Sequence, residues 1–130
     1  FVNSEIILLT NHKNWFKKMI NNKMIKIWIC ENFLLEDEKI GMVRFDFFNF
    51  YLSAEISINI NPNLRGKGYG IFCLKHSLDL LKNYMPCCNS IYAKVKKNNF
   101  GSLKIFQKNL FLYNLSDKKY EILKRELKDK

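Results

Sequence analysis

Three closely spaced glycines beside basic residues form the segment with the clearest chemical potential. The segment NPNLRGKGYG, residues 61–70, has every second position from 66 to 70 occupied by glycine, with Arg65 and Lys67 as neighbours. The start of a helix presents unpaired N–H groups and the positive end of the helix dipole, and glycine lets an anion approach the backbone closely. The segment therefore predicts a phosphate-binding loop. A glycine-rich turn with a solvated basic flank is the alternative.

Two common phosphate-binding motifs are absent from the sequence. A Walker loop requires GxxxxGK followed by Ser or Thr, and the chain contains no such string. The dinucleotide fingerprint requires GxGxxG, whereas Gly66, Gly68 and Gly70 form GxGxG. It should also open a βαβ unit with an acidic residue about twenty positions further on, but the next strand ends in KVKKN. We therefore exclude a Walker-type nucleotide site and a dinucleotide-binding site.

The glycine segment lies between elements that periodicity and turn residues predict. We expect helices over 10–22, 71–85 and 100–109, and strands over 24–32, 40–48, 53–60, 90–95 and 110–115. Alternation in the strand before the loop puts Glu55, Ser57 and Asn59 on one face and three isoleucines on the other. Residues 118–127 fit a helix and a strand equally well. This order indicates a mixed α+β domain.

Length and composition indicate one globular domain over residues 1–130. Hydrophobic residues make up 48%, which excludes a disordered chain, and no apolar stretch is long enough to cross a bilayer. The sequence does not begin with a secretory signal. Cys30 and Cys73 fall in strand-like and helix-like runs, which favours buried free thiols and a reducing cytoplasm. His12 and His76 each stand alone, so we expect no metal site.

The formal net charge of +10 indicates either simple solubility or a polyanionic partner. Nucleic acid, an anionic membrane and a phosphorylated small molecule are partners of this kind. The lysines are spread over nearly every segment and form no dense run, so nucleic acid is kept only as an alternative and no membrane partner is expected.

Two motifs resemble those of the GNAT superfamily of acyl-CoA N-acyltransferases. RGKGYG matches the signature Arg/Gln-x-x-Gly-x-Gly/Ala, and VKKNNFGSLKIFQKNLF is similar to the family's second motif, at the usual separation. The segments NSEIILLTNHKNWFKKMI, GMVRFDF, EISINI and IYAKVKKNN further resemble the branch that acetylates the 4-amino group of UDP-linked amino-deoxy sugars. Members usually carry a strand and a helix before the first of these segments, so we expect an N-terminally truncated chain. The resemblance implies a GNAT fold, with a central mixed, mostly antiparallel sheet whose strands splay and are flanked by helices.

The resemblance also implies which residues would hold the co-substrate acetyl-CoA. Backbone N–H groups of the glycine segment would bind its pyrophosphate, while one strand and the second motif would hold the pantetheine arm. The implied set is Ile58, Ile60, Arg65, Gly66, Lys67, Gly68, Tyr69, Gly70, Asn99, Ser102, Phe106 and Lys108. Lys108 would lie near the adenosine phosphate, and a solvated helix face is the alternative for it.

Direct acyl transfer needs a base for the amine, a group that polarises the thioester carbonyl and an acid for the leaving thiolate. A backbone N–H near Ser57 can serve the carbonyl. Glu55 is the first candidate for the base, because burial on its strand would make it more basic; an exposed carboxylate paired with a lysine is the alternative. The family's usual acid is a Tyr where this chain has Phe106, so either another group supplies the proton or the thiolate leaves unassisted. Tyr113 and Tyr92 are the candidates, and core packing with a satisfied hydroxyl is the alternative for each.

His12, Trp15 and Arg44 match the branch's H..WF and VRF elements, which implies a role in binding the acceptor. Arg44 has the charge for a diphosphate, and Trp15 has a flat surface for uracil or sugar, although a core position is the alternative for Trp15. The sequence thus predicts a cytoplasmic acetyltransferase acting on a small-molecule amine, first a UDP-linked amino sugar, through a tetrahedral intermediate. Acetylation of a protein N-terminus or another small amine is the nearest rival. A silent CoA-binding domain and a nucleic-acid module are rivals from other classes, and a homodimer is left open.

Overall fold

The structure is a computed structural model that describes residues 4–7, 24–32 and 39–127. Its elements follow one another as strands and helices of ordinary length. They are β1 (Ser4–Ile7), β2 (Ile25–Asn32), β3 (Lys39–Phe48), β4 (Ser53–Ile60), the 3₁₀ turn η1 (Pro62–Leu64), α2 (Tyr69–Tyr84), β5 (Ser90–Lys96), α3 (Phe100–Lys108), β6 (Leu112–Ser116) and β7 (Tyr120–Glu126). The helix expected over 10–22 lies outside the described residues.

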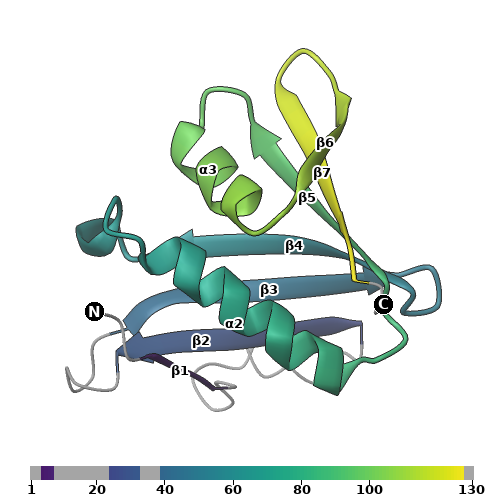
Figure 1. Cartoon of the computed structure of the whole chain (residues 1–130), viewed down its shortest axis with the longest axis horizontal. Coiled ribbons are helices and arrows are strands. Elements are labelled where there is room, and N and C mark those ends of the chain that lie inside the picture. Colours follow the sequence, from purple (N-terminus) through teal and green to yellow (C-terminus); the bar gives the residue numbers. More distant parts are fainter. Residues whose placement is uncertain (1–3, 8–23, 33–38, 128–130) are drawn as a thin grey trace.

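The strands form one seven-stranded sheet in the order β1-β2-β3-β4-β5-β7-β6. Every neighbouring pair is antiparallel except β4 and β5, which are parallel. Both described helices pack into one core with the sheet, with α2 across β2 to β4 and α3 beside β5, in the angle between β4 and β5 (Figure 1). The predicted mixed, mostly antiparallel α+β sheet is confirmed.

The two parallel strands separate after a short paired segment. Their ladder joins residues 53–56 of β4 to residues 90–93 of β5 and goes no further. Figure 1 shows β5 turning away from β4 past this point. The backbone groups of β4 that face β5 are therefore left without a strand partner over residues 57–60. An opening in the middle of the sheet results.

The core lies between the sheet and the two helices. It is built from apolar side chains at alternate strand positions and at helical spacing, and its largest fully buried members include Phe45, Val43, Leu74, Leu78, Leu81, Ile91 and Leu123. In β4 the alternation agrees with the prediction: Glu55, Ser57 and Asn59 are exposed, whereas Ile56 and Ile60 are buried. Neither described helix is long and apolar enough to cross a membrane.

Three features differ from the prediction or complete it. Within residues 118–127, which periodicity left open, Tyr120–Glu126 form β7, because antiparallel pairing with β5 buries Leu123 fully. Ser4–Ile7 forms a strand that we did not predict, paired with β2.

Cys30 of β2 and Cys73 of α2 are joined in a disulfide, with their Cα atoms 6.2 Å apart. The prediction that these thiols are free was wrong, although both side chains are buried as expected. The two residues are 43 positions apart in the sequence, and only the packing of α2 on the sheet brings them together.

Candidate active site

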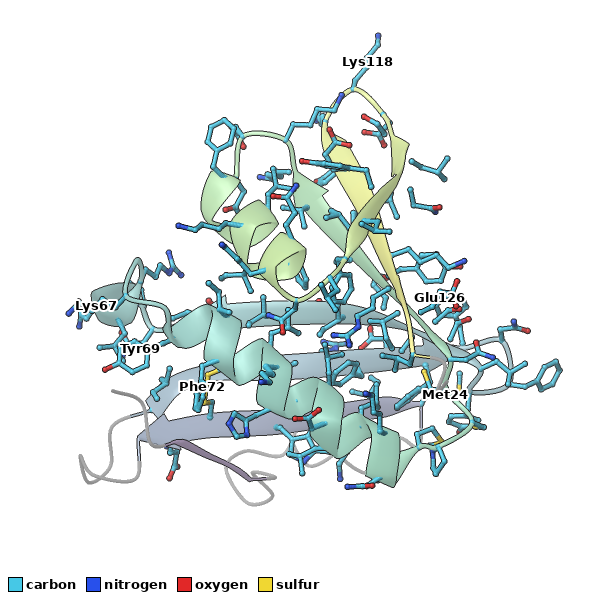
Figure 2. All side chains as sticks on the ribbon, in the orientation of Figure 1. Met24, Lys67, Tyr69, Phe72, Lys118 and Glu126 are labelled. Atoms are coloured by element: carbon cyan, nitrogen blue, oxygen red, sulfur yellow. A yellow bond between two sulfur atoms is a disulfide. The ribbon has the colours of Figure 1, made fainter. Side chains whose placement is uncertain are left out.

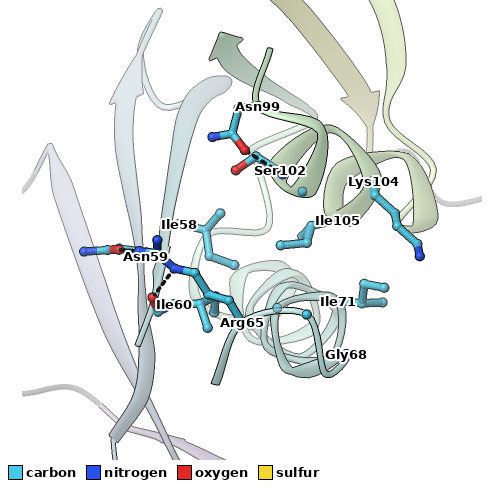
Figure 3. Close-up of a pocket in the computed structure, with 13 residues that line it drawn as sticks. Ile58, Asn59, Ile60, Arg65, Gly68, Ile71, Asn99, Ser102, Lys104 and Ile105 are labelled. Carbon is cyan, nitrogen blue, oxygen red and sulfur yellow. Dashed lines mark hydrogen bonds between the residues drawn. The ribbon is translucent and has the colours of Figure 1, made fainter. Parts of the chain in front are cut away.

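A cavity of about 370 Å³ lies on the helix face of the sheet, beside the opening between β4 and β5. Three elements surround it: the end of β4, the start of α2 with the preceding loop, and the first turns of α3 (Figure 3). We call it the donor cavity. Its lining is Ile58, Asn59, Ile60, Arg65, Gly66, Gly68, Gly70, Ile71, Asn99, Gly101, Ser102, Lys104 and Ile105.

The glycine loop owes its shape to two left-handed backbone conformations. Gly66 has φ of +77° and Gly68 has φ of +89°. A Cβ atom at either position would meet no atom within 4 Å, so the need for glycine is conformational and not steric. An L-residue in this region costs roughly 1–2 kcal/mol. These two glycines turn the chain sharply from η1 into α2.

The start of α2 is open to an anion. Gly68 is the N-cap residue, no side chain caps this end, and the first turn carries no acidic residue. The first N–H groups of a helix have no partner within the helix and lie at the positive end of its dipole. Gly68, Gly70 and Ile71 line the donor cavity, so this positively polarised helix start forms part of its wall. The site fits a phosphate or diphosphate.

Gly70 has a different task from the other two glycines. A Cβ atom there would overlap the side chain of Ile105 and approach Ile60 Cγ1 at 3.4 Å. Gly70 is buried in the first turn of α2, so its missing side chain lets α3 pack closely against α2 and β4. The sequence interpretation, which assigned all three glycines to the approach of a phosphate, was incomplete here.

Arg65 fixes the loop to the end of β4. Its Nε donates to the carbonyl oxygen of Ile60 at 2.9 Å, and its Nη2 donates to Asn59 Oδ1 at 3.3 Å (Figure 3). The first bond satisfies a strand-end carbonyl, and the two together hold the guanidinium at the rim of the donor cavity.

The opposite wall is the start of α3. Asn99 Oδ1 accepts a hydrogen bond from the backbone N–H of Ser102 at 3.1 Å, which makes Asn99 the N-cap of this helix. Both residues line the donor cavity (Figure 3). The two segments that sequence reasoning linked are therefore brought to one site, although about thirty residues separate them.

Four residues of the implied acetyl-CoA set do not line the donor cavity. Lys67 is exposed at the outside of the loop, and Tyr69 is half-buried against the core. Phe106 is buried and packs edge-on against Phe111, with ring centroids 5.1 Å apart, because this face of α3 turns to the core. Lys108 is exposed one turn beyond the residues of α3 that reach the cavity.

Sequence reasoning missed several lining residues, of which Lys104 is the most informative. It lies four positions before Lys108, on the same helix face and one turn nearer the cavity. The distance from the N-cap of α3 could have identified it, since only the first turns of that helix meet the glycine loop.

The other face of the sheet carries the candidate catalytic side chains. Glu55 is exposed on that face and has Asp46 of β3 and Tyr92 of β5 as its neighbours across the ladders. The burial that we expected around Glu55 is not present. Tyr92 is half-buried and lies one position before the last residue pair of the β4–β5 ladder, next to the start of the opening.

Two predicted residues have other partners. Arg44 makes a two-pronged ion pair with Asp46 on the same strand, at 2.6 Å and 3.1 Å, so its guanidinium already has a carboxylate partner. Tyr113 lies on the edge strand β6, is 57% exposed, and its hydroxyl accepts a hydrogen bond from Gln107 of α3. It does not line the donor cavity.

Two further predictions concern the acceptor and metal ions. His12 and Trp15, expected to bind the acceptor, lie outside the described residues. Within residues 4–7, 24–32 and 39–127, no three His, Cys, Asp or Glu side chains come together as a metal site.

The site and fold agree with what sequence comparison finds. The model of the acetyltransferase (GNAT) family matches residues 6–110. The chain belongs to this family and is an N-acetyltransferase that uses acetyl-CoA. A search of curated protein sequences finds no significant match.

Solved structures share the fold at low sequence identity. One is Campylobacter jejuni N-acetyltransferase PseH in complex with acetyl coenzyme A, 22% identical, covering 88% of this chain and 76% of PseH with a TM-score of 0.74. A Vibrio cholerae spermidine N-acetyltransferase in complex with CoA and spermine is 15% identical, covering 95% of each chain with a TM-score of 0.77. A protein described as a phosphinothricin N-acetyltransferase is 22% identical over 98% of this chain and 100% of its own, with a TM-score of 0.74. These likenesses concern the fold.

Proposed function

We propose that the chain transfers the acetyl group of acetyl-CoA to a primary amine of a small molecule, and that this acceptor is a nucleotide-linked amino sugar. The observation that carries the proposal is the opening between β4 and β5. It lies beside the donor cavity on the helix face and begins just past the exposed carboxylate of Glu55 and the half-buried phenol of Tyr92, which share the outer face. Donor and acceptor can therefore approach one another from opposite sides of the sheet.

The donor side would hold acetyl-CoA through the backbone. The first N–H groups of α2 bind the pyrophosphate, with Arg65 and Lys104 adding positive charge at the rim. The pantetheine arm lies along residues 57–60 of β4, whose β5-facing backbone groups have no strand partner. The same backbone supplies a donor for the thioester carbonyl near Ser57.

The acceptor side would carry the proton transfers. The amine gives a proton to Glu55 as its nitrogen bonds to the carbonyl carbon. The tetrahedral intermediate then breaks its C–S bond, and the thiolate takes a proton from Tyr92. We prefer Tyr92 to Tyr113 because Tyr92 is the ladder neighbour of Glu55, whereas Tyr113 lies on the far edge strand. Phe106 has no hydroxyl and is buried in the core.

Acetyl-CoA incubations read by mass spectrometry test the activity. A UDP-linked 4-amino sugar, spermidine and a peptide with a free N-terminus are offered separately, and the mass of each is followed for a gain of one acetyl group. Acetylation of the amino sugar above the other two supports the proposal. Preferential acetylation of spermidine or of the peptide would show that the proposed acceptor is wrong. If no amine is acetylated, the proposed activity is refuted.

The role of Tyr92 has its own test. Tyr92→Phe keeps the ring and removes the proton, so the pH profile of kcat should lose its alkaline limb and kcat should fall about tenfold to a hundredfold. Tyr113→Phe is the matched control and should leave kcat within about twofold. The reverse order of effects would return the role to Tyr113.

We place the activity in the cytoplasm, where acetyl-CoA is available. The Cys30–Cys73 disulfide does not oppose this, because both residues are fully buried and shielded from soluble thiols in the folded chain. Alkylation of the freshly extracted, denatured protein, followed by mass measurement, reports whether the bond exists in cells. A disulfide formed only after secretion would contradict the location.

A further inference from the structure

A second hollow, of about 410 Å³, lies at the far end of β5. It is formed where the turn after β5 meets the turn between β6 and β7, at the tip marked by Lys118 in Figure 2. We call it the basic hollow. Its lining is Lys96, Lys97, Asn98, Lys118, Lys119 and Tyr120.

The basic hollow is held together by backbone hydrogen bonds. The N–H of Lys97 donates to the carbonyl oxygen of Lys119 at 2.9 Å, which ties one turn to the other. The carboxylate of Asp117 accepts from the N–H groups of Tyr120 and Lys119 at 2.7 Å and 2.8 Å. These bonds lower the pKa of Asp117 and fix the hairpin turn. The lysines therefore gather on a framework that does not depend on their own side chains.

Charge is strongly unbalanced around this hollow. Its four lining lysines are exposed, and Lys94 lies next to them with its Nζ 4.5 Å from the ring centroid of Tyr120. Asp117 is the acidic residue of the same turn, and its carboxylate is already engaged by two backbone N–H groups. Like charges that lie close together repel one another and destabilise the folded state. An anion bound among these lysines would relieve that repulsion.

The hollow is connected to the candidate catalytic pair along one strand face. Tyr92, Lys94 and Lys96 alternate on β5, so they share the outer face of the sheet with Glu55. On β7, Lys124 lies over the ring of Tyr92, with its Nζ 5.3 Å from the centroid. From Tyr92 to Lys96 the strand rises about 13 Å, at roughly 3.3 Å per residue. This is about the length of a sugar joined to a diphosphate.

We propose that the basic hollow binds the phosphate groups of the acetyl acceptor while the acceptor's amine lies at Glu55 and Tyr92. The proposal rests on the function proposed above and narrows the acceptor to amines that carry a phosphate or diphosphate. The tyrosines along β5 and β7 offer flat surfaces for the sugar or base between these two ends.

The same charges disfavour the other acceptors considered. A polyamine is itself a cation and would be repelled by five lysines along its path. A nucleic acid would be attracted, but a hollow of this size admits a few phosphates and does not form a continuous track. We therefore commit to a small phosphorylated ligand.

The test uses the full chain and UDP as the probe. Lys97→Glu with Lys118→Glu removes the basic character, and Lys75→Glu with Lys82→Glu, on the exposed face of α2, is the matched control. Each substitution changes the charge by −2, so both double variants have a formal charge of +10 − 4 = +6. By calorimetry, UDP should bind at least about tenfold more weakly to the first variant and about equally to the control, with uridine binding poorly to all proteins.

Kinetics then separate this proposal from the function itself. In the first variant the KM for the UDP-linked amino sugar should rise at least about tenfold while the KM for acetyl-CoA stays within about twofold. Equal UDP binding by both double variants, or a rise in the KM for acetyl-CoA instead, would overturn the basic hollow as the acceptor's phosphate site. The proposal would also be overturned if a single-stranded RNA bound the wild-type chain more tightly than UDP and did not bind the first variant. That result would indicate a nucleic-acid-binding surface. Failure of the wild-type chain to acetylate any amine would instead refute the proposed function, and calorimetry would still report on the hollow.

Discussion

The donor cavity and the outer face of the sheet meet at the same opening, yet they are built from different chemistry. The cavity offers backbone N–H groups, glycines and a capped helix start, all fixed by hydrogen bonds and close packing. The outer face offers exposed side chains: carboxylates, tyrosines and lysines. A backbone site suits a ligand that is the same in every reaction, because side-chain changes alter it little. A side-chain site suits the partner that sets specificity.

Replacing Glu55, the candidate base, is expected to give the largest difference between effects on the reaction and effects on acetyl-CoA binding. Glu55→Gln keeps the shape but cannot accept a proton, so kcat should fall by about 10²–10⁴. Acetyl-CoA affinity should not change, since Glu55 does not line the donor cavity. Steady-state kinetics and calorimetry measure the two effects, with Glu121→Gln on β7 as the control. A kcat within about threefold of wild type would remove Glu55 from the reaction.

A negative charge placed at the start of α2 should weaken the binding of acetyl-CoA, which the Glu55 substitution leaves unchanged. Gly68→Asp puts a carboxylate and a strained φ where the anion is expected, so acetyl-CoA should bind about a hundredfold more weakly. Gly68→Ala adds the backbone strain without the charge and should weaken acetyl-CoA binding much less. If the two variants bind acetyl-CoA equally, the helix start is not the anion site.

Packing behind the donor cavity can be tested through stability. Gly70→Ala drives a Cβ atom into Ile105 and should lower the free energy of unfolding by about 1–3 kcal/mol, measured in urea. Gly101→Ala is the matched change in α3, where the nearest atom is Asn99 Oδ1 at 3.9 Å. It should be neutral or stabilising by up to about 1 kcal/mol. Equal losses would mean that Gly70 is not needed for the approach of the two helices.

The smallest expected effect distinguishes two lysines on one helix face. Lys104 lines the donor cavity and Lys108 does not. Lys104→Ala should weaken acetyl-CoA binding by about twofold to fivefold, as expected for one exposed charge contact, and Lys108→Ala should leave it unchanged. Calorimetry at two salt concentrations checks the pair, because only the Lys104 effect should diminish with salt. If Lys108→Ala weakens acetyl-CoA binding more than Lys104→Ala does, the adenosine end of acetyl-CoA lies further along α3 than the donor cavity indicates.

Local pattern was a good guide wherever a residue's role depends on its own neighbours. Alternation in β4, the helical spacing of α2 and the glycines of the loop all predicted their elements, and the loop led to the donor. The pattern failed where two distant segments decide the outcome. It left residues 118–127 between helix and strand, it missed the bond from Cys30 to Cys73, and it did not single out Lys104, which lines the donor cavity.

The sequence by itself determined the class of enzyme, because RGKGYG and VKKNNFGSLKIFQKNLF are short contiguous motifs whose resemblance to those of the GNAT superfamily can be read without the fold. Tertiary structure alone decided which side chains gather on the outer face of the sheet, where we propose that the acceptor binds. Glu55, Tyr92 and the lysines of the basic hollow come from two strands and two turns, and strand register sets where these segments lie relative to one another. Register depends on pairing energies summed across the whole sheet, which no single segment contains.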